Sequence, residues 1–135
     1  MNHKTILIIE DDPHISESLS EMLSCKGYNT IVQDNGLDGI DDAVRQFPDL
    51  IICDIMMPGA NGYEVIQALK NHKGLKGTPF IFISAKSQHS DIRDGMSAGA
   101  DDYLVKPFKA SDLFDSVETR LQKSEDHRNS LNELQ

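Results

Sequence analysis

The sequence predicts a doubly wound α/β domain, with five parallel strands in the order 2-1-3-4-5 and five helices that cover both faces of the sheet. Three observations lead to this fold class. Apolar runs alternate with amphipathic helical segments along the chain. Three of these runs are apolar at every position, as in strands that helices cover on both sides. The 135 residues are enough for one domain with a single core.

The expected strands are short apolar runs that end at charged or turn-forming residues. In chain order they cover residues 6–9, 30–32, 50–54, 80–83 and 103–105. The first, third and fourth runs are the longest, so the order 2-1-3-4-5 places them inside the sheet and the two shorter strands at its edges. This arrangement is flavodoxin-like.

A segment with apolar residues at helical spacing follows each strand. The first helix is expected to begin with Asp12 as its cap and Pro13 in its first turn, and Gly27 is expected to take the left-handed position at its end. The apolar faces of three others are formed by Leu37, Ile40, Val44 and Phe47 in the second helix, by Tyr63, Val65, Ile66 and Leu69 in the third, and by Leu113, Phe114, Val117 and Leu121 in the fifth.

The fourth helix, over about residues 87–98, has a weaker pattern. Its clear apolar anchors are Ile92 and Met96, and it contains Gly95, a poor helix former. We expect it to be the most mobile element of the domain.

The chain continues after the fifth helix. We expect residues 1–123 to form one domain and residues 124–135 to form a helical extension or a linker toward an output domain. Leu131 and Leu134 permit such an extension, although Ser124 interrupts its apolar seam.

Composition limits the classes of function. The chain has 22 acidic and 13 basic residues and a net charge of -9, which argues against nucleic-acid binding by this chain alone. Its apolar runs fall short of the roughly 20 residues that cross a membrane, and its first residues lack the apolar core of a signal peptide, so we expect a cytoplasmic protein. Cys25 and Cys53 are expected to be free thiols, and the five histidines are expected to be solvated because they lack ligand spacing.

Chemically active side chains follow four of the five strands. Glu10 and Asp11 come after the first strand, Asp54 ends the third, Ser84 follows the fourth and Lys106 follows the fifth. Because the carboxyl ends of parallel strands meet at one edge of a sheet, we expect these side chains to converge there.

Three carboxylates at close range repel one another unless a cation holds them, and a hard divalent ion such as Mg²⁺ suits their oxygen atoms. With Mg²⁺ bound, Asp54 can attack a phosphorus atom, while Lys106 and Ser84 supply a positive charge and a hydroxyl donor. Each residue alone also has an ordinary interpretation. Asp54 could open a turn, Ser84 could be a hydrogen bonder at a strand end, and Lys106 could be a surface lysine. Their joint placement favours a site.

The motifs resemble those of the response regulator receiver domain of two-component signalling. The resemblance covers about residues 4–123. It rests on Ile-Ile-Glu-Asp-Asp at 8–12, Asp-Ile-Met-Met-Pro-Gly at 54–59 with Gly62 beyond, Ser-Ala at 84–85, and Gly-Ala-Asp-Asp-Tyr-Leu-Val-Lys-Pro-Phe at 99–108.

The resemblance implies a phosphoacceptor and a metal site. Asp54 would accept a phosphoryl group from the phosphohistidine of a sensor histidine kinase or a phosphotransfer protein. Asp11, Asp54 and the backbone carbonyl of Met56 would bind Mg²⁺, and Glu10 would act mainly through water. Such a domain is not an enzyme in the usual sense, because it catalyses only its own phosphorylation and dephosphorylation.

The resemblance also implies a switch. Ser84 would bond the phosphoryl group, Lys106 would pair with it after a cis peptide bond to Pro107, and Tyr103 would be the switch aromatic. Movement of Ser84 would let Tyr103 turn inward and change the face of the fourth helix, fifth strand and fifth helix, which could pair as a homodimer. Because Met56 cannot orient water, we also expect a phosphorylated state that lasts minutes or longer.

One alternative function remains open at this point, a Mg²⁺-dependent phosphohydrolase with Asp54 as its nucleophile. Such enzymes commonly carry a second acid two residues after the nucleophile, where this chain has Met56, and no substrate-capping insertion is visible. The sequence therefore favours the signalling domain.

Overall fold

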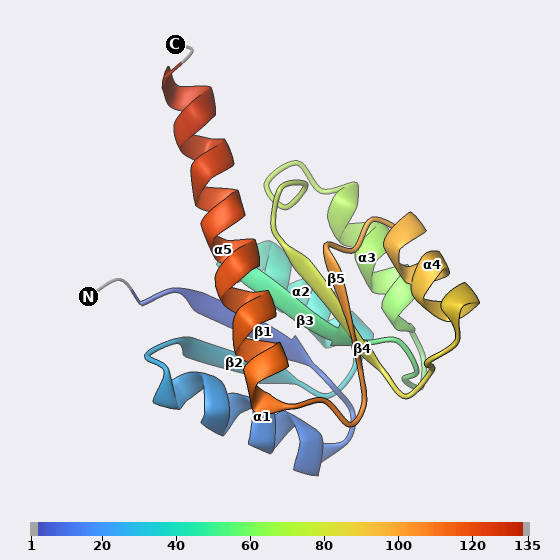
Figure 1. Ribbon diagram of the computed structural model, residues 1–135. Coiled ribbons are helices and arrows are strands. Elements are labelled where there is room, and N and C mark those ends of the chain that lie inside the picture. Colours follow the sequence, from blue (N-terminus) through green and yellow to red (C-terminus); the bar gives the residue numbers. More distant parts are fainter. Residues whose placement is uncertain (1–2, 134–135) are drawn as a thin grey trace.

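The computed structural model describes residues 3–133 and contains five strands that alternate with five helices (Figure 1). In chain order the elements are β1 (Thr5–Ile9), α1 (Pro13–Cys25), β2 (Asn29–Gln33), α2 (Gly36–Gln46), β3 (Leu50–Asp54), α3 (Gly62–Lys70), β4 (Phe80–Ser84), α4 (His89–Ser97), β5 (Asp102–Val105) and α5 (Ala110–Glu133).

The strands form one parallel sheet in the order β2-β1-β3-β4-β5, which confirms the predicted fold class. β1, β3 and β4 lie inside the sheet, where each has a neighbour on both sides. The register aligns Ile9 of β1 with Cys53 of β3, so the residues that follow these two strands emerge side by side. This register brings the first acidic pair next to Asp54.

Side chains of the central strands alternate between two apolar layers. On one face, Ile6 and Ile8 of β1 pack with α1 and α5, and on the other face Leu7 and Ile9 pack with α2 and α3. Figure 1 shows α1 and α5 on one side of the sheet and α2, α3 and α4 on the other. Burial on both faces explains why these runs are apolar without alternation.

Aspartates at the amino ends of β3 and β5 connect these strands to their neighbours. The carboxylate of Asp49 accepts a 2.8 Å hydrogen bond from the backbone N–H of Thr5, and that of Asp101 accepts a 2.8 Å bond from the N–H of Phe80. Each bond satisfies the first N–H of the adjacent strand, which lies beyond the ladder of the sheet.

The ends of α1 agree with the sequence prediction. Asp12 caps the helix by accepting a 2.9 Å hydrogen bond from the N–H of His14, and Pro13 occupies its first position. Gly27 follows the helix with φ +94°, a backbone conformation that glycine adopts without a steric cost.

The apolar face predicted for α2 is partly wrong. Leu37 is 69% exposed, and Phe47 lies outside the helix with φ +49° and is 51% exposed. The helix instead turns small residues toward the sheet: a Cβ atom on Gly39 would lie 2.5 Å from a carbon atom of Ile9. A helix that approaches the sheet so closely cannot place a leucine there.

Two other sequence predictions also need correction. Met96 of α4 is 42% exposed, and Gly95 is the buried position of that helix. His72 is only partly exposed, because its ring packs against Phe47 at a centroid distance of 6.0 Å. The prediction that every histidine is solvated is therefore wrong for His72.

α5 continues as one helix to Glu133, past the boundary at residue 123 that the sequence suggested. Figure 1 shows its last turns standing clear of the rest of the domain. Leu131 is exposed on this extension, and Leu134 lies outside the described residues. Among residues 3–133, no helix has both the length and the apolar character needed to cross a membrane.

Candidate functional site

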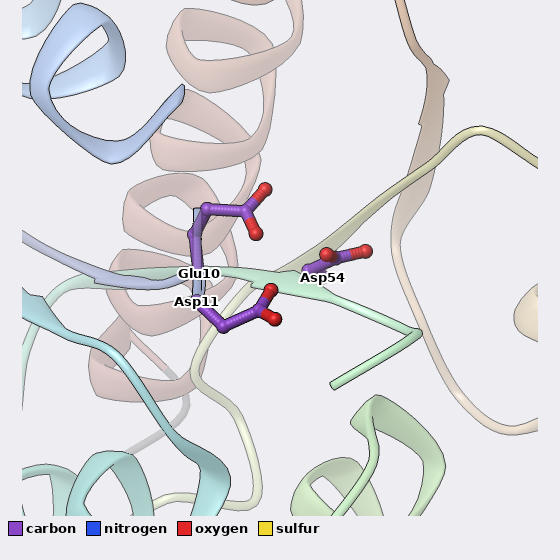
Figure 2. Close-up of side chains that lie close together, drawn as sticks. All are labelled: Glu10, Asp11 and Asp54. Atoms are coloured by element: carbon purple, nitrogen blue, oxygen red, sulfur yellow. The ribbon is translucent and has the colours of Figure 1, made fainter. Parts of the chain in front are cut away.

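Three carboxylates converge where β1 and β3 end, as the sequence predicted. Glu10, Asp11 and Asp54 each offer an oxygen atom, and these atoms lie within 4.8 Å of one another. Figure 2 shows the three side chains gathered at the ends of their strands. Glu10 is 1% exposed and Asp54 is 5% exposed, whereas Asp11 is open to solvent.

Lys106 completes this cluster from the loop that follows β5. Its ammonium lies 2.6 Å from Oε1 of Glu10 and 3.2 Å from Oδ2 of Asp54. The Lys106–Pro107 peptide bond is cis, as expected. The cluster therefore holds three carboxylates and one ammonium, so it has an excess of negative charge when all of these groups are ionised.

Burial determines the electrostatics of this cluster. It raises the pKa of Glu10 from 4.5 to about 7, and the hydrogen bond from Lys106 opposes this rise only in part. Burial alone would lower the pKa of Lys106, but the hydrogen bond to Glu10 and the charge of Asp54 leave that pKa above its ordinary value. The buried glutamate and the lysine thus stabilise each other's charged forms.

Backbone contacts hold Asp54 and its loop at the end of the sheet. The N–H of Ile55 donates to the carbonyl of Ile83 on β4 at 3.2 Å, and the N–H of Gly62 closes the loop by donating to the carbonyl of Ile55 at 2.9 Å. The N–H of Met56 donates to Oδ1 of Asp54 at 3.3 Å, while its side chain is exposed. The carboxylate is thereby oriented from two sides, by Met56 and by Lys106.

Ser84 lies at the same edge, at the end of β4, and is fully buried. Its hydroxyl accepts a 3.1 Å hydrogen bond from the N–H of Lys86. Its carbonyl accepts a 2.8 Å bond from the N–H of Lys106, which joins the two predicted site residues through the backbone.

Tyr103 of β5 points inward and belongs to the apolar core. It is 8% exposed, and its hydroxyl donates to the carbonyl of Lys86 at 2.9 Å. The backbone of Lys86 therefore contacts both expected switch residues, Ser84 through its N–H and Tyr103 through its carbonyl. The sequence could not predict this role of Lys86, because backbone N–H and carbonyl groups can make such contacts whatever the side chain is.

The donor set fits a hard divalent cation. Carboxylate oxygens are the ligands that Mg²⁺ and Ca²⁺ prefer, and two of the three acids are buried, where an added positive charge relieves their repulsion. Burial is the main cause of the raised pKa of Glu10, and the neighbouring carboxylate of Asp54 raises this pKa further.

A doubly wound sheet with these acids and a lysine at its carboxyl edge has the fold and polar cluster of a receiver domain. The family model of the response regulator receiver domain matches residues 6–118. The chain therefore belongs to this family, whose members act as phosphoacceptor switches in signal transduction.

Named relatives include a DNA-binding response regulator and a transcriptional regulatory protein. The DNA-binding response regulator MtrA of Mycolicibacterium smegmatis is 38% identical over 122 residues, which are 90% of this chain and 52% of MtrA. The transcriptional regulatory protein DltR of Streptococcus agalactiae is 37% identical over 119 residues, which are 88% of this chain and 52% of DltR. The chain thus spans about half the length of these relatives.

Solved structures share the fold. One is the receiver domain of a sensor histidine kinase from Pseudomonas aeruginosa, with a magnesium ion coordinated in the active site cleft. It matches with a TM-score of 0.83 and 27% sequence identity over 90% of this chain and 99% of that domain.

Proposed function

We propose that this chain accepts a phosphoryl group on Asp54 from the phosphohistidine of a sensor histidine kinase or a phosphotransfer protein, in a Mg²⁺-dependent reaction. The observation that carries this proposal is the position of the Asp54 carboxylate. It lies at the carboxyl edge of the sheet, within 4.8 Å of two other acids and 3.2 Å from the ammonium of Lys106.

The proposed transfer is a displacement at phosphorus. A carboxylate oxygen of Asp54 forms a bond to phosphorus as the bond from phosphorus to the histidine nitrogen breaks, and the electron pair of that bond returns to the imidazole. Lys106 is close enough to pair with the phosphoryl oxygens as it now pairs with Oδ2 of Asp54. Bound Mg²⁺ supplies further neutralisation of these oxygens.

The proposed metal ligands are the carboxylates of Asp11 and Asp54 and the backbone carbonyl of Met56. Glu10 would act mainly through water, which fits its 2.6 Å ion pair with Lys106 because that pair already engages one of its oxygens. This set leaves positions for water and for the phosphoryl group, as Mg²⁺ usually requires.

The proposed switch begins at Ser84. A phosphoryl group on Asp54 adds negative charge and acceptor oxygens, which attract the Ser84 hydroxyl away from the N–H of Lys86. Lys86 also accepts the hydrogen bond of Tyr103, so this change reaches the face of α4, β5 and α5. This face has two possible packings. Phosphorylation can shift the equilibrium between them only by the difference in its interaction free energy with each packing.

The proposed partners follow from the family and from α5. Relatives about twice as long are named a DNA-binding response regulator and a transcriptional regulatory protein, and the helix of residues 110–133 leads away from the domain. Both observations support a role for residues 124–135 as a linker to an output domain. A homodimer through the face of α4, β5 and α5 is the second proposed assembly. We place the domain in the cytoplasm, where a kinase phosphohistidine is available.

Acetyl phosphate with Mg²⁺ tests the proposal. Wild-type protein is expected to gain the mass of one phosphoryl group and to keep it, whereas Asp54→Asn gains none. Asp115→Asn, which alters an exposed acid of α5, is the control and should behave as wild type. Rapid turnover of small phosphoesters without a retained phosphoryl group would instead indicate the hydrolase, which the family match and Met56 disfavour.

A further inference from the structure

Gly95 is the buried position of α4, and helix formation alone does not explain why a glycine stands there. Glycine is among the poorest helix formers, and α4 is a short helix with few apolar anchors. An alanine would strengthen the helix if the space beside it were free. The side chains packed against this position show that it is not.

The ring of Tyr103 fills the space beside Gly95. A Cβ atom at position 95 would lie 2.7 Å from Cδ2 of Tyr103 and 3.0 Å from its Cε2. Real Cβ contacts are longer than this, so the ring and an alanine side chain cannot both occupy their places. The inward ring therefore depends on the absence of a side chain at residue 95.

Two further contacts hold the ring in its inward position. It packs edge-on against Phe82 at a centroid distance of 6.4 Å, and its hydroxyl is fixed by the 2.9 Å hydrogen bond to the carbonyl of Lys86. Phe82 cannot yield, because it is fully buried and packs against the rings of Phe80 and Tyr63 at 5.1 and 5.5 Å. A side chain at position 95 would therefore force either Tyr103 outward or α4 away from the sheet.

We propose that Gly95 is a positioning residue that admits the inward ring of Tyr103, and that the lack of a side chain there sets the balance between the inward and outward positions of this ring. Rotation of one side chain disturbs fewer contacts than displacement of a helix, so a larger residue at position 95 turns the ring outward. The outward ring loses its hydrogen bond to Lys86. The packing of Tyr103 against Gly95 does not depend on the proposed function, and only its consequence for signalling rests on that function.

The ring position can be measured directly in protein labelled with 3-fluorotyrosine. The chain has three tyrosines, and Tyr103→Phe identifies the fluorine signal of Tyr103. In wild type this signal should be shielded from a soluble paramagnetic agent. In Gly95→Ala it should broaden several-fold more, whereas Gly77→Ala, where a Cβ meets nothing within 4 Å, should match wild type. An equally shielded signal in Gly95→Ala would overturn the proposal.

Comparison of Gly95→Ala in the wild-type protein and in the Tyr103→Ala variant separates this role from a general effect on folding. In the presence of Tyr103, Gly95→Ala should lower the urea midpoint or leave it unchanged, because the ring is displaced. In Tyr103→Ala the nearest remaining atom to a Cβ at position 95 is Cδ2 of Phe82 at 3.3 Å, so the same substitution should be more favourable there, by up to about fourfold in the folded-to-unfolded ratio, the gain of an unhindered helical Gly→Ala change. The same sign and size of effect in both backgrounds, or failure of the double variant to fold, would contradict the proposal.

Acetyl phosphate with Mg²⁺ distinguishes this proposal from the proposed function. Gly95→Ala should gain the same phosphoryl mass as wild type, because position 95 lies against Tyr103 rather than the acids. If neither protein gains the mass, the proposed function fails, and the fluorine result still decides the role of Gly95.

Discussion

The ammonium of Lys106 lies 2.6 Å from Oε1 of Glu10, closer than the 3.2 Å that separates it from Oδ2 of Asp54. Glu10 is buried just after β1, and its ion pair holds the ammonium of Lys106 beside the carboxylate of Asp54, which we expect to react. The pair thus fixes the position of a positive charge at the site.

Replacement of this lysine should show how strongly a buried, charged glutamate without a partner destabilises the folded protein. In Lys106→Met, Glu10 loses the partner that favours its charged form, so we expect a loss of about 1–3 kcal/mol in the free energy of unfolding at pH 8. The loss should shrink at pH 5.5, where Glu10 is protonated. Urea unfolding at both pH values measures this, with exposed Lys109→Met as the control. An equal loss at both pH values would show that Lys106 does not stabilise the charged form of Glu10.

The raised pKa of Glu10 predicts that Mg²⁺ binding weakens in acid. Between pH 8 and pH 6 the glutamate, with a pKa of about 7, takes up a proton that competes with the cation, so the affinity should fall by about tenfold. Titration calorimetry at the two pH values checks this. In Glu10→Gln the Mg²⁺ affinity should change little between pH 8 and pH 6. An equally large fall in the affinity of that variant would exclude Glu10 as the cause.

The same pKa has a consequence for stability without metal. Because the folded protein raises this pKa from 4.5 to about 7, the folded state binds the proton more tightly than the unfolded chain. The stabilisation from Glu10 is therefore complete below about pH 4.5 and is lost as pH rises through about 7. Added Mg²⁺ should restore stability at the upper end of this window, which urea unfolding with and without a chelator can test.

The exposed side chain of Met56 predicts slow loss of the phosphoryl group. A thioether gives no group that orients an attacking water, so the phosphorylated protein should last minutes or longer with Mg²⁺ present. Met56→Glu should shorten this lifetime by about tenfold, less than a fully positioned general base provides. Radiolabel retention measures both proteins, and loss from wild type within seconds would refute the prediction.

Gly62 should be intolerant of any side chain. A Cβ atom there would lie 2.7 Å from the backbone oxygen of Asp54 and 2.8 Å from Cα of Ile55, and backbone atoms cannot move aside. We expect Gly62→Ala to lower the free energy of unfolding by about 1–3 kcal/mol and to slow phosphorylation by displacing Asp54. Gly77→Ala, at an open position, should change neither property. Wild-type values for Gly62→Ala would show that the loop can shift freely.

Much of the fold could be predicted because the central strands carry a strong signal. The continuous apolar runs of β1, β3 and β4 follow directly from burial on both faces, and the sheet order follows from placing these runs inside. The convergence of Glu10, Asp11 and Asp54 then follows from topology alone, because parallel neighbouring strands end at one edge.

The errors arose where packing rather than periodicity decides burial. Leu37 fits a helical repeat but lies outside the contact, because α2 approaches the sheet through glycine and alanine. Met96 fits the repeat of α4, yet Gly95 is the residue that faces the core. A hydrophobic pattern cannot show that a helix approaches closely enough to exclude its own larger residues.

The finer contacts of the site could not be predicted from the sequence for a different reason. The ion pair of Glu10 with Lys106 spans 96 residues, and the contacts of Lys86 with Ser84 and Tyr103 use backbone atoms. Neither kind of contact produces a local pattern. Only the three-dimensional arrangement shows that Lys106 is held by Glu10 and that Tyr103 is turned inward.

The phosphoacceptor residue can be identified most directly by locating the phosphoryl group chemically. After treatment with acetyl phosphate and Mg²⁺, borohydride reduces an aspartyl phosphate to homoserine, which peptide mass mapping assigns to a single position. If Asp54 is the phosphoacceptor, homoserine appears at position 54 in wild type and at no position in Asp54→Asn. Homoserine at Asp11 or elsewhere in the wild-type chain, or none at all in protein that carries the phosphoryl mass, would contradict this assignment.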